Sequence, residues 1–193
     1  MTVFVALLRA VNVGGTGMLS MKDLAGLCTK LGLENVRTYI QSGNVVFASR
    51  LSKNRVRESL EAALAAHMGK KIDVVLRDAA ELRQVLIANP FPDVHPSKVA
   101  VAFCSAPVQK KLFDAVVIPG NEQIVTRDQE FYVHYPDGMG RSKLKFPKIE
   151  GVATVRNINT VTKLVAMADE AASPTRVEKG VKNGVTKGTR KAP

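Results

Sequence analysis

Cysteine, histidine and aromatic residues are scarce in this sequence. It contains two cysteines, three histidines and no tryptophan, and aromatic residues make up 5% of its 193 residues. Cys28 and Cys104 stand alone in apolar surroundings, without the Cys-x-x-Cys or Cys/His spacing of zinc sites and redox motifs. The pattern argues against a disulfide framework and a metal centre, and it leads us to expect no cofactor and a reducing, cytoplasmic environment.

Long hydrophobic runs are also missing. The first apolar run, residues 3–8, ends at Arg9 and is far shorter than the ~20 apolar residues of a membrane span. We therefore expect no signal peptide, no transmembrane helix and no membrane partner. A hydrophobic content of 46% is nevertheless enough for a sizeable core, so the sequence predicts a globular protein.

Acidic residues are few relative to basic ones, and the formal net charge is +11. Residues 174–193 contain six Lys or Arg residues and one Glu, so this segment carries +5 and residues 1–173 carry +6. The segment has no aromatic residue and too little apolar surface to fold, which predicts a disordered basic tail. The remaining charge is only moderately basic, and nucleic acid stays one possible partner.

The first half of the chain alternates strand and helix patterns. Apolar runs and capping residues predict a buried strand, a helix, a hairpin, a second helix and a further strand. These elements are expected at residues 2–11, 20–31, 36–48, 56–68 and 72–77. Asp78-x-x-Glu81 then starts a third helix, which the run Asn89-Pro90-Phe91-Pro92 ends.

The second half repeats this plan. Strands are predicted at 99–104, 122–127, 130–135 and 152–156, with helices opening at Pro107, around 142–146 and from about Thr160. The order predicts an α+β fold of two tandem ferredoxin-like (βαββαβ) lobes, each an antiparallel sheet with helices on one face, plus a C-terminal helix and the tail. We place the lobes at 1–90 and 91–173 and the tail at 174–193.

A polar turn in the hairpin forms part of the first candidate site. Gly43 can adopt positive φ, which allows the chain to reverse there. Near it we expect a glycine-rich loop and an arginine, which together suit a phosphate or carboxylate. An equally simple alternative is that the glycines relieve a turn and the polar groups satisfy loop backbone. The candidate residues are Arg9, Asn12, Gly14, Gly15, Gln41, Ser42 and Asn44.

A second group of cationic, hydroxyl and amide residues lies around the last predicted strand. It suits anion recognition better than acid–base chemistry, because no carboxylate pair accompanies it. The alternative is an ordinary capped helix beside a solvated basic turn. Its candidate ligand-binding residues are Ser142, Lys143, Arg156, Asn157, Asn159 and Thr160, beside Arg141 and Thr154.

Five motifs together resemble the bacterial family catalogued as domain of unknown function 1697. They are LLRAVNVGG, VRTYIQSGNVVF, NPFP, YPDGMGRSKL and ATVRNINTVTKL. The resemblance covers nearly all of residues 1 to about 170. The resemblance implies a two-lobed α+β architecture but no reaction. The sequence differs from the family pattern at Thr16 and Met18, where a lysine is common, and at Ile158, where an aromatic residue is common.

The residues favour a binding protein whose cleft between two lobes holds an anionic small molecule or nucleic acid through Arg9, Lys143 and Arg156. An enzyme acting on a phosphorylated or carboxylated small molecule in the same cleft is the alternative, with Ser142 or Tyr39 taking part. A scaffold role is a third possibility. No residue identifies a catalytic group, and nothing indicates the oligomeric state.

Overall fold

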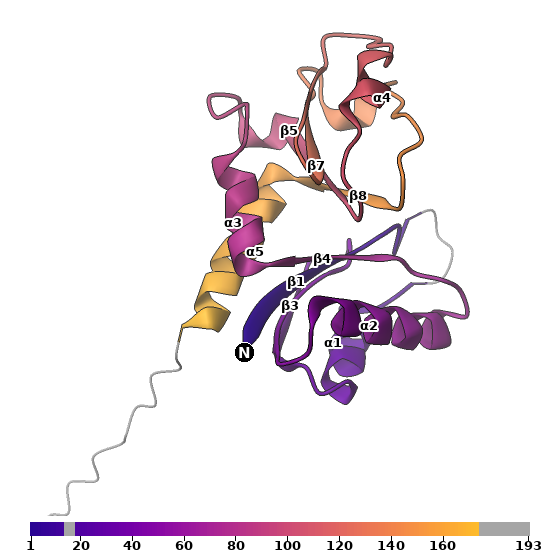
Figure 1. Cartoon of the computed structure of the whole chain (residues 1–193), viewed down its shortest axis with the longest axis vertical. Coiled ribbons are helices and arrows are strands. Elements are labelled where there is room, and N and C mark those ends of the chain that lie inside the picture. The colour runs from indigo at the N-terminus through magenta and orange to yellow at the C-terminus, as the bar shows by residue number, and fades with distance from the viewer. Residues whose placement is uncertain (14–17, 174–193) are drawn as a thin grey trace, which may run out of the picture.

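The computed structural model describes residues 1–13 and 18–173. Within them the chain forms an α+β fold of two lobes, each built on a four-stranded antiparallel sheet (Figure 1). The predicted α+β class is therefore confirmed. The predicted tail, 174–193, and the glycine-rich loop, 14–17, lie outside the described residues.

The first sheet has the strand order β2-β3-β1-β4, and the second has β6-β7-β5-β8. Numbered from the start of each lobe, both orders are second, third, first, fourth. The elements of the first lobe are β1 (Thr2–Leu8), α1 (Met21–Lys30), β2 (Glu34–Tyr39), β3 (Asn44–Ser49), α2 (Lys53–Met68), β4 (Val74–Asp78) and α3 (Ala79–Ile87). The second lobe contains η1 (Pro96–Lys98), β5 (Val99–Cys104), α4 (Lys110–Asp114), β6 (Gln123–Thr126), β7 (Glu130–His134), η2 (Met139–Arg141), β8 (Ala153–Asn157) and α5 (Ile158–Ala172).

Short polar motifs fix the helix starts. Ser20 caps α1 by accepting a hydrogen bond from the Asp23 N–H, and Asn157 caps α5 by accepting one from the Asn159 N–H. At α3, Asp78 and Glu81 form a reciprocal capping box.

The prediction of a helix around 142–146 is wrong. The chain forms the short 3₁₀ helix η2 just before this segment, and 142–146 is irregular.

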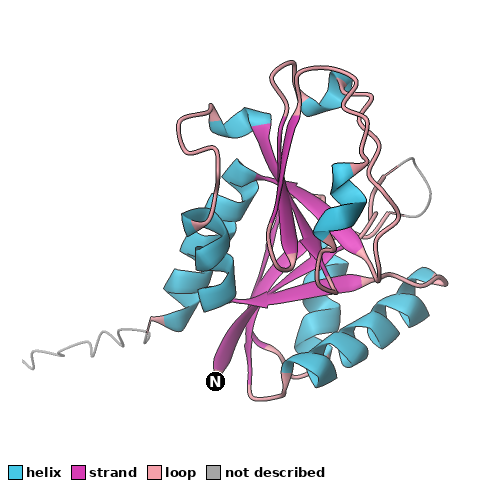
Figure 2. Ribbon diagram, turned by 45° about the horizontal axis from the view of Figure 1, so that its top comes forward, coloured by secondary structure: helices cyan, strands magenta, loops and turns pink. Residues whose placement is uncertain are grey.

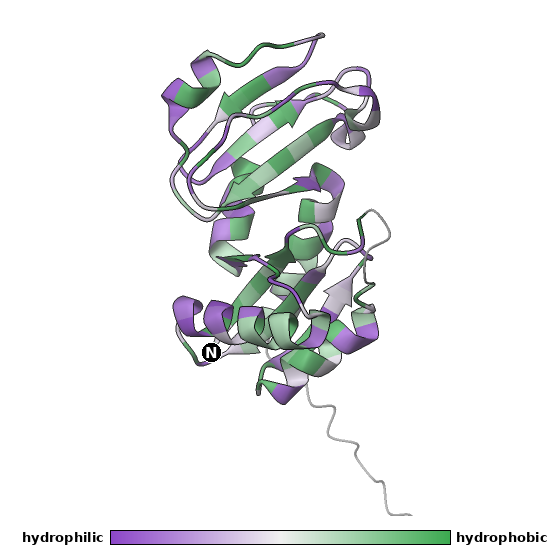
Figure 3. Ribbon diagram, turned by 90° about the vertical axis from the view of Figure 1, so that its right-hand side faces the viewer, coloured by the Kyte–Doolittle hydropathy of each residue, from purple (hydrophilic) through white to green (hydrophobic). Residues whose placement is uncertain are grey.

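Helices cover both faces of the first sheet, which corrects the prediction of helices on one face. Helices α1 and α2 lie on one side, and α3 and α5 lie on the other, as Figures 1 and 2 show. The physical reason is the composition of β1, whose residues from Val3 to Leu8 are all buried and so need apolar cover on both faces. The strands of both lobes are largely hydrophobic in Figure 3.

The C-terminal helix joins the lobes through a shared core. Leu164 and Val161 of α5 are fully buried in a cluster that contains Val5 of the first sheet and Val101 and Phe103 of the second. Helix α5 therefore packs on the first lobe although it follows the last strand of the second. The division at residue 90 stays a prediction, but the two lobes bury one continuous apolar surface between them.

Candidate functional site

Arg156 of β8 reaches from the second lobe into the first. Its side chain is 7% exposed, and all five of its N–H donors are used. Nε donates to Asn44 Oδ1 at 2.6 Å, and Nη2 donates to the Leu8 carbonyl at 2.8 Å and the Ser42 carbonyl at 3.0 Å. Nη1 donates to Thr154 Oγ1 at 2.7 Å and to the adjacent Val155 carbonyl at 2.8 Å.

The surroundings of Arg156 make it a structural cation. Burial lowers its pKa to about 10, so it remains charged at neutral pH. Its acceptors are carbonyl, amide and hydroxyl oxygens rather than a carboxylate. Because every donor is already engaged, Arg156 has none left to offer an external anion in this conformation.

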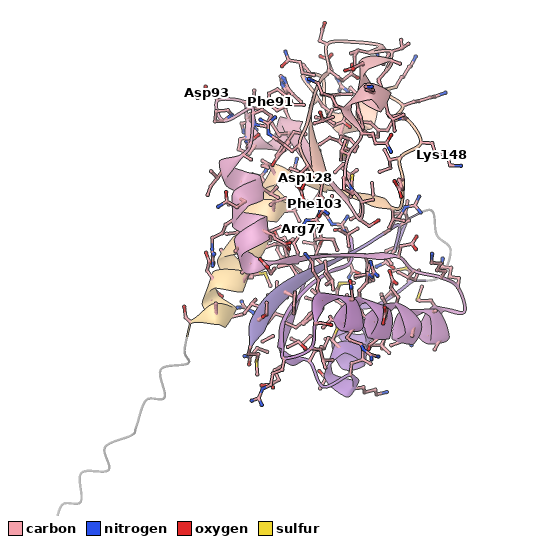
Figure 4. All side chains as sticks on the ribbon, viewed as in Figure 1. Arg77, Phe91, Asp93, Phe103, Asp128 and Lys148 are labelled. Atoms are coloured by element: carbon pink, nitrogen blue, oxygen red, sulfur yellow. The ribbon has the colours of Figure 1, made fainter. Side chains whose placement is uncertain are left out.

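Arg77 of β4 makes the reverse contact, from the first lobe into the second. It is 3% exposed; Nε donates to Glu130 Oε1 at 2.8 Å, and Nη2 donates to the Cys104 carbonyl at 2.9 Å. Arg77 is the fourth residue of β4 and Arg156 the fourth of β8, and each precedes the capping residue of the next helix. Each lobe thus contacts the other through an arginine at the equivalent position of its fourth strand. Figure 4 shows Arg77 between them.

The structure brings Arg156 and the hairpin residues of the first candidate site together. Asn44 is fully buried and donates from Nδ2 to the Tyr39 carbonyl and to Ser42 Oγ. Gly43 has a φ of +74°, and a Cβ there would lie 2.9 Å from Leu8 Cβ, so the predicted glycine turn is confirmed. These groups hold the lobes together.

Asn12 and Arg9 have local partners. Asn12 Nδ2 donates to the Leu19 and Gln41 carbonyls, and Oδ1 accepts from the Leu19 N–H, so this side chain fixes the entry to α1. Arg9 is half exposed and lies 3.4 Å from Asp73 Oδ2. The Gln41 side chain is exposed nearby, while Gly14 and Gly15 lie outside the described residues.

Ser142 and Lys143 line a different cavity. This cavity, about 240 Å³, lies entirely within the second lobe and also contains Glu122, Tyr135 and Arg141. Ser142 Oγ donates to Glu122 Oε1, and this hydrogen bond is the main reason that the pKa of Glu122 is lowered. The structure therefore separates Lys143 from Arg156, contrary to the expectation of one shared cleft.

The remaining predicted residues lie at the start of α5. Asn157 Nδ2 donates to the Ser97 carbonyl, and Asn157 Oδ1 caps the helix. Asn159 is exposed and Thr160 half buried, and neither side chain has a hydrogen-bond partner within residues 1–13 and 18–173. These residues match the capped-helix alternative.

A basic cavity between the lobes was not anticipated from the sequence. We call it the basic inter-lobe pocket; its volume is about 190 Å³. Its side chains come from α2, β4 and two turns of the second lobe. The lining polar residues are Lys53, Asn54, Arg57, Arg77, Ser105 and Gln129.

Arg57 carries the uncompensated charge in this pocket. Lys53 pairs with Glu81 at 2.7 Å and Arg77 pairs with Glu130, but the half-buried Arg57 has no ion-pair or hydrogen-bond partner in the part of the chain that the structure describes. The side chain of Gln129 also lacks a partner there. The Ser105 hydroxyl accepts from the Val152 N–H and still has its own proton to donate.

The outer edge of β4 adds a backbone donor. Arg9 N–H donates to the Asp73 carbonyl, which makes Leu7–Val75 and Val5–Arg77 the hydrogen-bonded pairs of the ladder. Leu76 therefore points its N–H and carbonyl away from β1. Its carbonyl accepts from Arg77 Nη1, while its N–H faces the pocket side with no acceptor among the described residues.

One signal in the sequence could have indicated this pocket. Lys53 and Arg57 are four residues apart in a helix, on the same face, and the first turn of α2 contains no acidic residue. Like charges at this spacing repel and are unfavourable near a helix N-terminus. Such a pair suggests that another group, from a distant segment or a ligand, faces these charges.

Metal and thiol chemistry find no support among the described residues. They contain no group of three or more His, Cys, Asp or Glu side chains placed to hold a metal ion. Both cysteines are buried and unbonded, and burial raises the pKa of Cys28 to about 12 and that of Cys104 to about 11. The thiols therefore stay protonated and poorly nucleophilic at neutral pH.

Among residues 1–13 and 18–173, every helix is too short or too polar to span a bilayer.

The chain belongs to the family described as "Protein of unknown function (DUF1697)", whose model matches residues 1–132. This confirms the resemblance drawn from the motifs. No curated protein matches the sequence. Among solved structures, the chain is similar to the conserved bacterial protein SP0830 from Streptococcus pneumoniae, with 24% identity, a TM-score of 0.72, and coverage of 86% of this chain and 98% of the other. At this identity the likeness supports the shared fold.

Proposed function

We propose that this protein binds a small anionic ligand, through a phosphate or carboxylate group, in the basic inter-lobe pocket. The observation that carries the proposal is Arg57, a half-buried cation without a partner among the described residues, in a cavity lined by both lobes. An anion there would receive charge-assisted hydrogen bonds from Arg57. The Leu76 N–H, the Gln129 amide and the Ser105 hydroxyl are further donors on the cavity wall.

The proposal keeps the expected ligand class and the expected place between the lobes, but it changes the cations. Arg57 takes the role first given to Arg156, because Arg156 is saturated by protein oxygens. We also propose a more detailed description of the fold. The common strand order makes each lobe ferredoxin-like, and the equivalent arginines point to duplication.

Titration with inorganic phosphate tests the proposal. We expect calorimetry to detect binding to the wild type and at least a tenfold weaker affinity in Arg57→Ala, since a charge-assisted hydrogen bond contributes about 1.5–3 kcal/mol. The Leu76 amide resonance should shift on titration. Arg55→Ala is the matched control, because Arg55 is an exposed arginine of the same helix that does not line the pocket; its affinity should stay within twofold of wild type.

Two results would reject the pocket. One is equal weakening by Arg55→Ala and Arg57→Ala, which would mean a general charge effect. The other is loss of phosphate binding in Lys143→Ala with no loss in Arg57→Ala, which would place the anion in the second-lobe cavity.

An enzyme that uses Ser142 is the weaker candidate. Ser142 donates to Glu122 as a nucleophile would donate to its base, beside Arg141 and Lys143. However, the lowered pKa of Glu122 makes its carboxylate a weaker base than usual, and an activated serine needs a stronger one. The geometry therefore favours a binding role.

A further inference from the structure

The basic inter-lobe pocket has a larger neighbour. A second cavity of about 350 Å³ lies between α3 and the β6–β7 hairpin, and Arg77 and Gln129 line both cavities. We call it the hairpin cavity. Because the two share these side chains, they lie next to each other at Arg77 and Gln129. Figure 4 shows Asp128 of this hairpin and Arg77 in the region between the lobes.

The hairpin cavity differs in character from the basic pocket. Val85, Ala88 and Tyr132 give it an apolar part, and the Tyr132 hydroxyl is already bonded to the Val85 carbonyl at 2.7 Å. Two of its acidic residues, Glu81 and Glu130, pair with Lys53 and Arg77. Their charges are therefore neutralised, and the other two charged residues of the lining, Arg127 and Asp128, carry opposite signs.

Polar groups without partners, two of them on exposed residues, also line the hairpin cavity. The side-chain amide of Gln84 and the carboxylate of Asp128 have no hydrogen-bond or ion-pair partner within the described ranges 1–13 and 18–173, and the Gln129 amide is equally available. An amide both donates and accepts, and a carboxylate accepts from hydroxyl or amino groups. The cavity thus suits an uncharged body that has hydroxyl and amide-like groups and one apolar or planar face.

We propose that the two cavities together bind a nucleoside monophosphate, with the phosphate at Arg57 and the nucleoside in the hairpin cavity. This inference rests on the proposed function, because it needs the anion in the basic inter-lobe pocket. It goes further by naming the class of ligand: ribose hydroxyls and base edges match Asp128, Gln84 and Gln129, and a base offers a planar face to Val85 and Ala88.

Calorimetric titration with three kinds of probe tests the inference: inorganic phosphate, ribose 5-phosphate and each of the four common ribonucleoside 5′-monophosphates. At least one nucleotide should bind tenfold or more tightly than inorganic phosphate and more tightly than ribose 5-phosphate. The double variant Gln84→Ala, Asp128→Asn should lose most of that gain and retain the affinity for inorganic phosphate. Ile87→Ala, an exposed change on α3 outside the cavity, should alter neither affinity.

The outcomes separate the two proposals. If phosphate binds in an Arg57-dependent way and no nucleotide binds more tightly, the nucleoside site is wrong and the anion pocket stands. If ribose 5-phosphate binds as tightly as the best nucleotide, the hairpin cavity recognises the sugar and the assignment to nucleotides is wrong. If a nucleotide binds tightly but the double variant leaves its affinity unchanged, the hairpin cavity is not its site. If no probe binds, both proposals fall.

Discussion

Two buried arginines reach from one lobe into the other, and their environments differ in kind. Arg77 faces a carboxylate, Glu130, whereas Arg156 is surrounded by neutral oxygens. A buried guanidinium without a counter-ion is costly to desolvate, and the hydrogen bonds from its five N–H groups offset that cost. Removing the side chain would leave several inward-facing oxygens without donors.

Replacing Arg156 should therefore lower stability rather than ligand affinity. In Arg156→Ala the Ser42 carbonyl and Asn44 Oδ1 lose this donor, and the Leu8 carbonyl keeps only the weaker bond from the Thr154 hydroxyl at 3.2 Å. We therefore expect a loss of about 3 kcal/mol or more in the free energy of unfolding. Urea denaturation measures it. Arg55→Ala removes the same charge at an exposed site and should change stability by less than about 0.5 kcal/mol. A loss as small as that of the control would show that the network contributes little.

Helix α5 has a role that its place in the sequence conceals. It follows β8 directly, with Asn157 as both the last strand residue and the helix cap. Its apolar face then covers β1 and β3 of the first lobe beside α3. A single helix thus closes the second lobe and completes the core of the first.

Shortening a buried apolar side chain of α5 should destabilise both lobes together. Leu164 is fully buried, and Leu164→Ala should cost about 2–5 kcal/mol through lost burial and the cavity left behind. The control is Ile87→Ala on α3, whose side chain is 74% exposed, with an expected change below about 0.5 kcal/mol. Circular dichroism and the fluorescence of a probe placed in either lobe should report one coincident transition in urea. Two separate transitions would contradict the shared core.

At the scale of the whole molecule, the positive charge has two separate locations. In the described residues Arg57 is a half-buried cation without a partner, in a pocket of limited size that suits a small anion. Residues 174–193 carry +5 of the +11 in a stretch without aromatic residues. Any binding of duplex nucleic acid should therefore depend on that segment more than on the pocket.

The salt dependence of binding can separate the contribution of residues 174–193 from that of Arg57. Deleting residues 174–193 removes six cations and should flatten the slope of log affinity for duplex DNA against log salt by up to about 5, because each phosphate contact contributes about 0.9. Arg57→Ala in the full chain should change the slope by about one contact at most while weakening phosphate binding. Fluorescence anisotropy across a salt series measures both. If the deletion alters neither affinity nor slope, the segment does not bind nucleic acid.

The sequence by itself determined most of the local structure, because the signals for it lie within a few residues. Ser20, Asp78 and Asn157 cap helices through bonds to neighbouring backbone groups, and Gly43 turns the hairpin because a side chain there would clash. The apolar composition of β1 also determined its burial. The five motifs placed the chain in its family.

Tertiary structure decided which polar groups are free to act. Arg156 and Arg57 look equally available in the sequence, yet one is saturated and the other unpaired among the described residues. The difference arises from backbone carbonyls of Leu8 and Ser42, more than a hundred residues away from Arg156. Every residue has a carbonyl, so these partners leave no mark in the side-chain pattern. Only the packing of one lobe on the other determines where those carbonyls point.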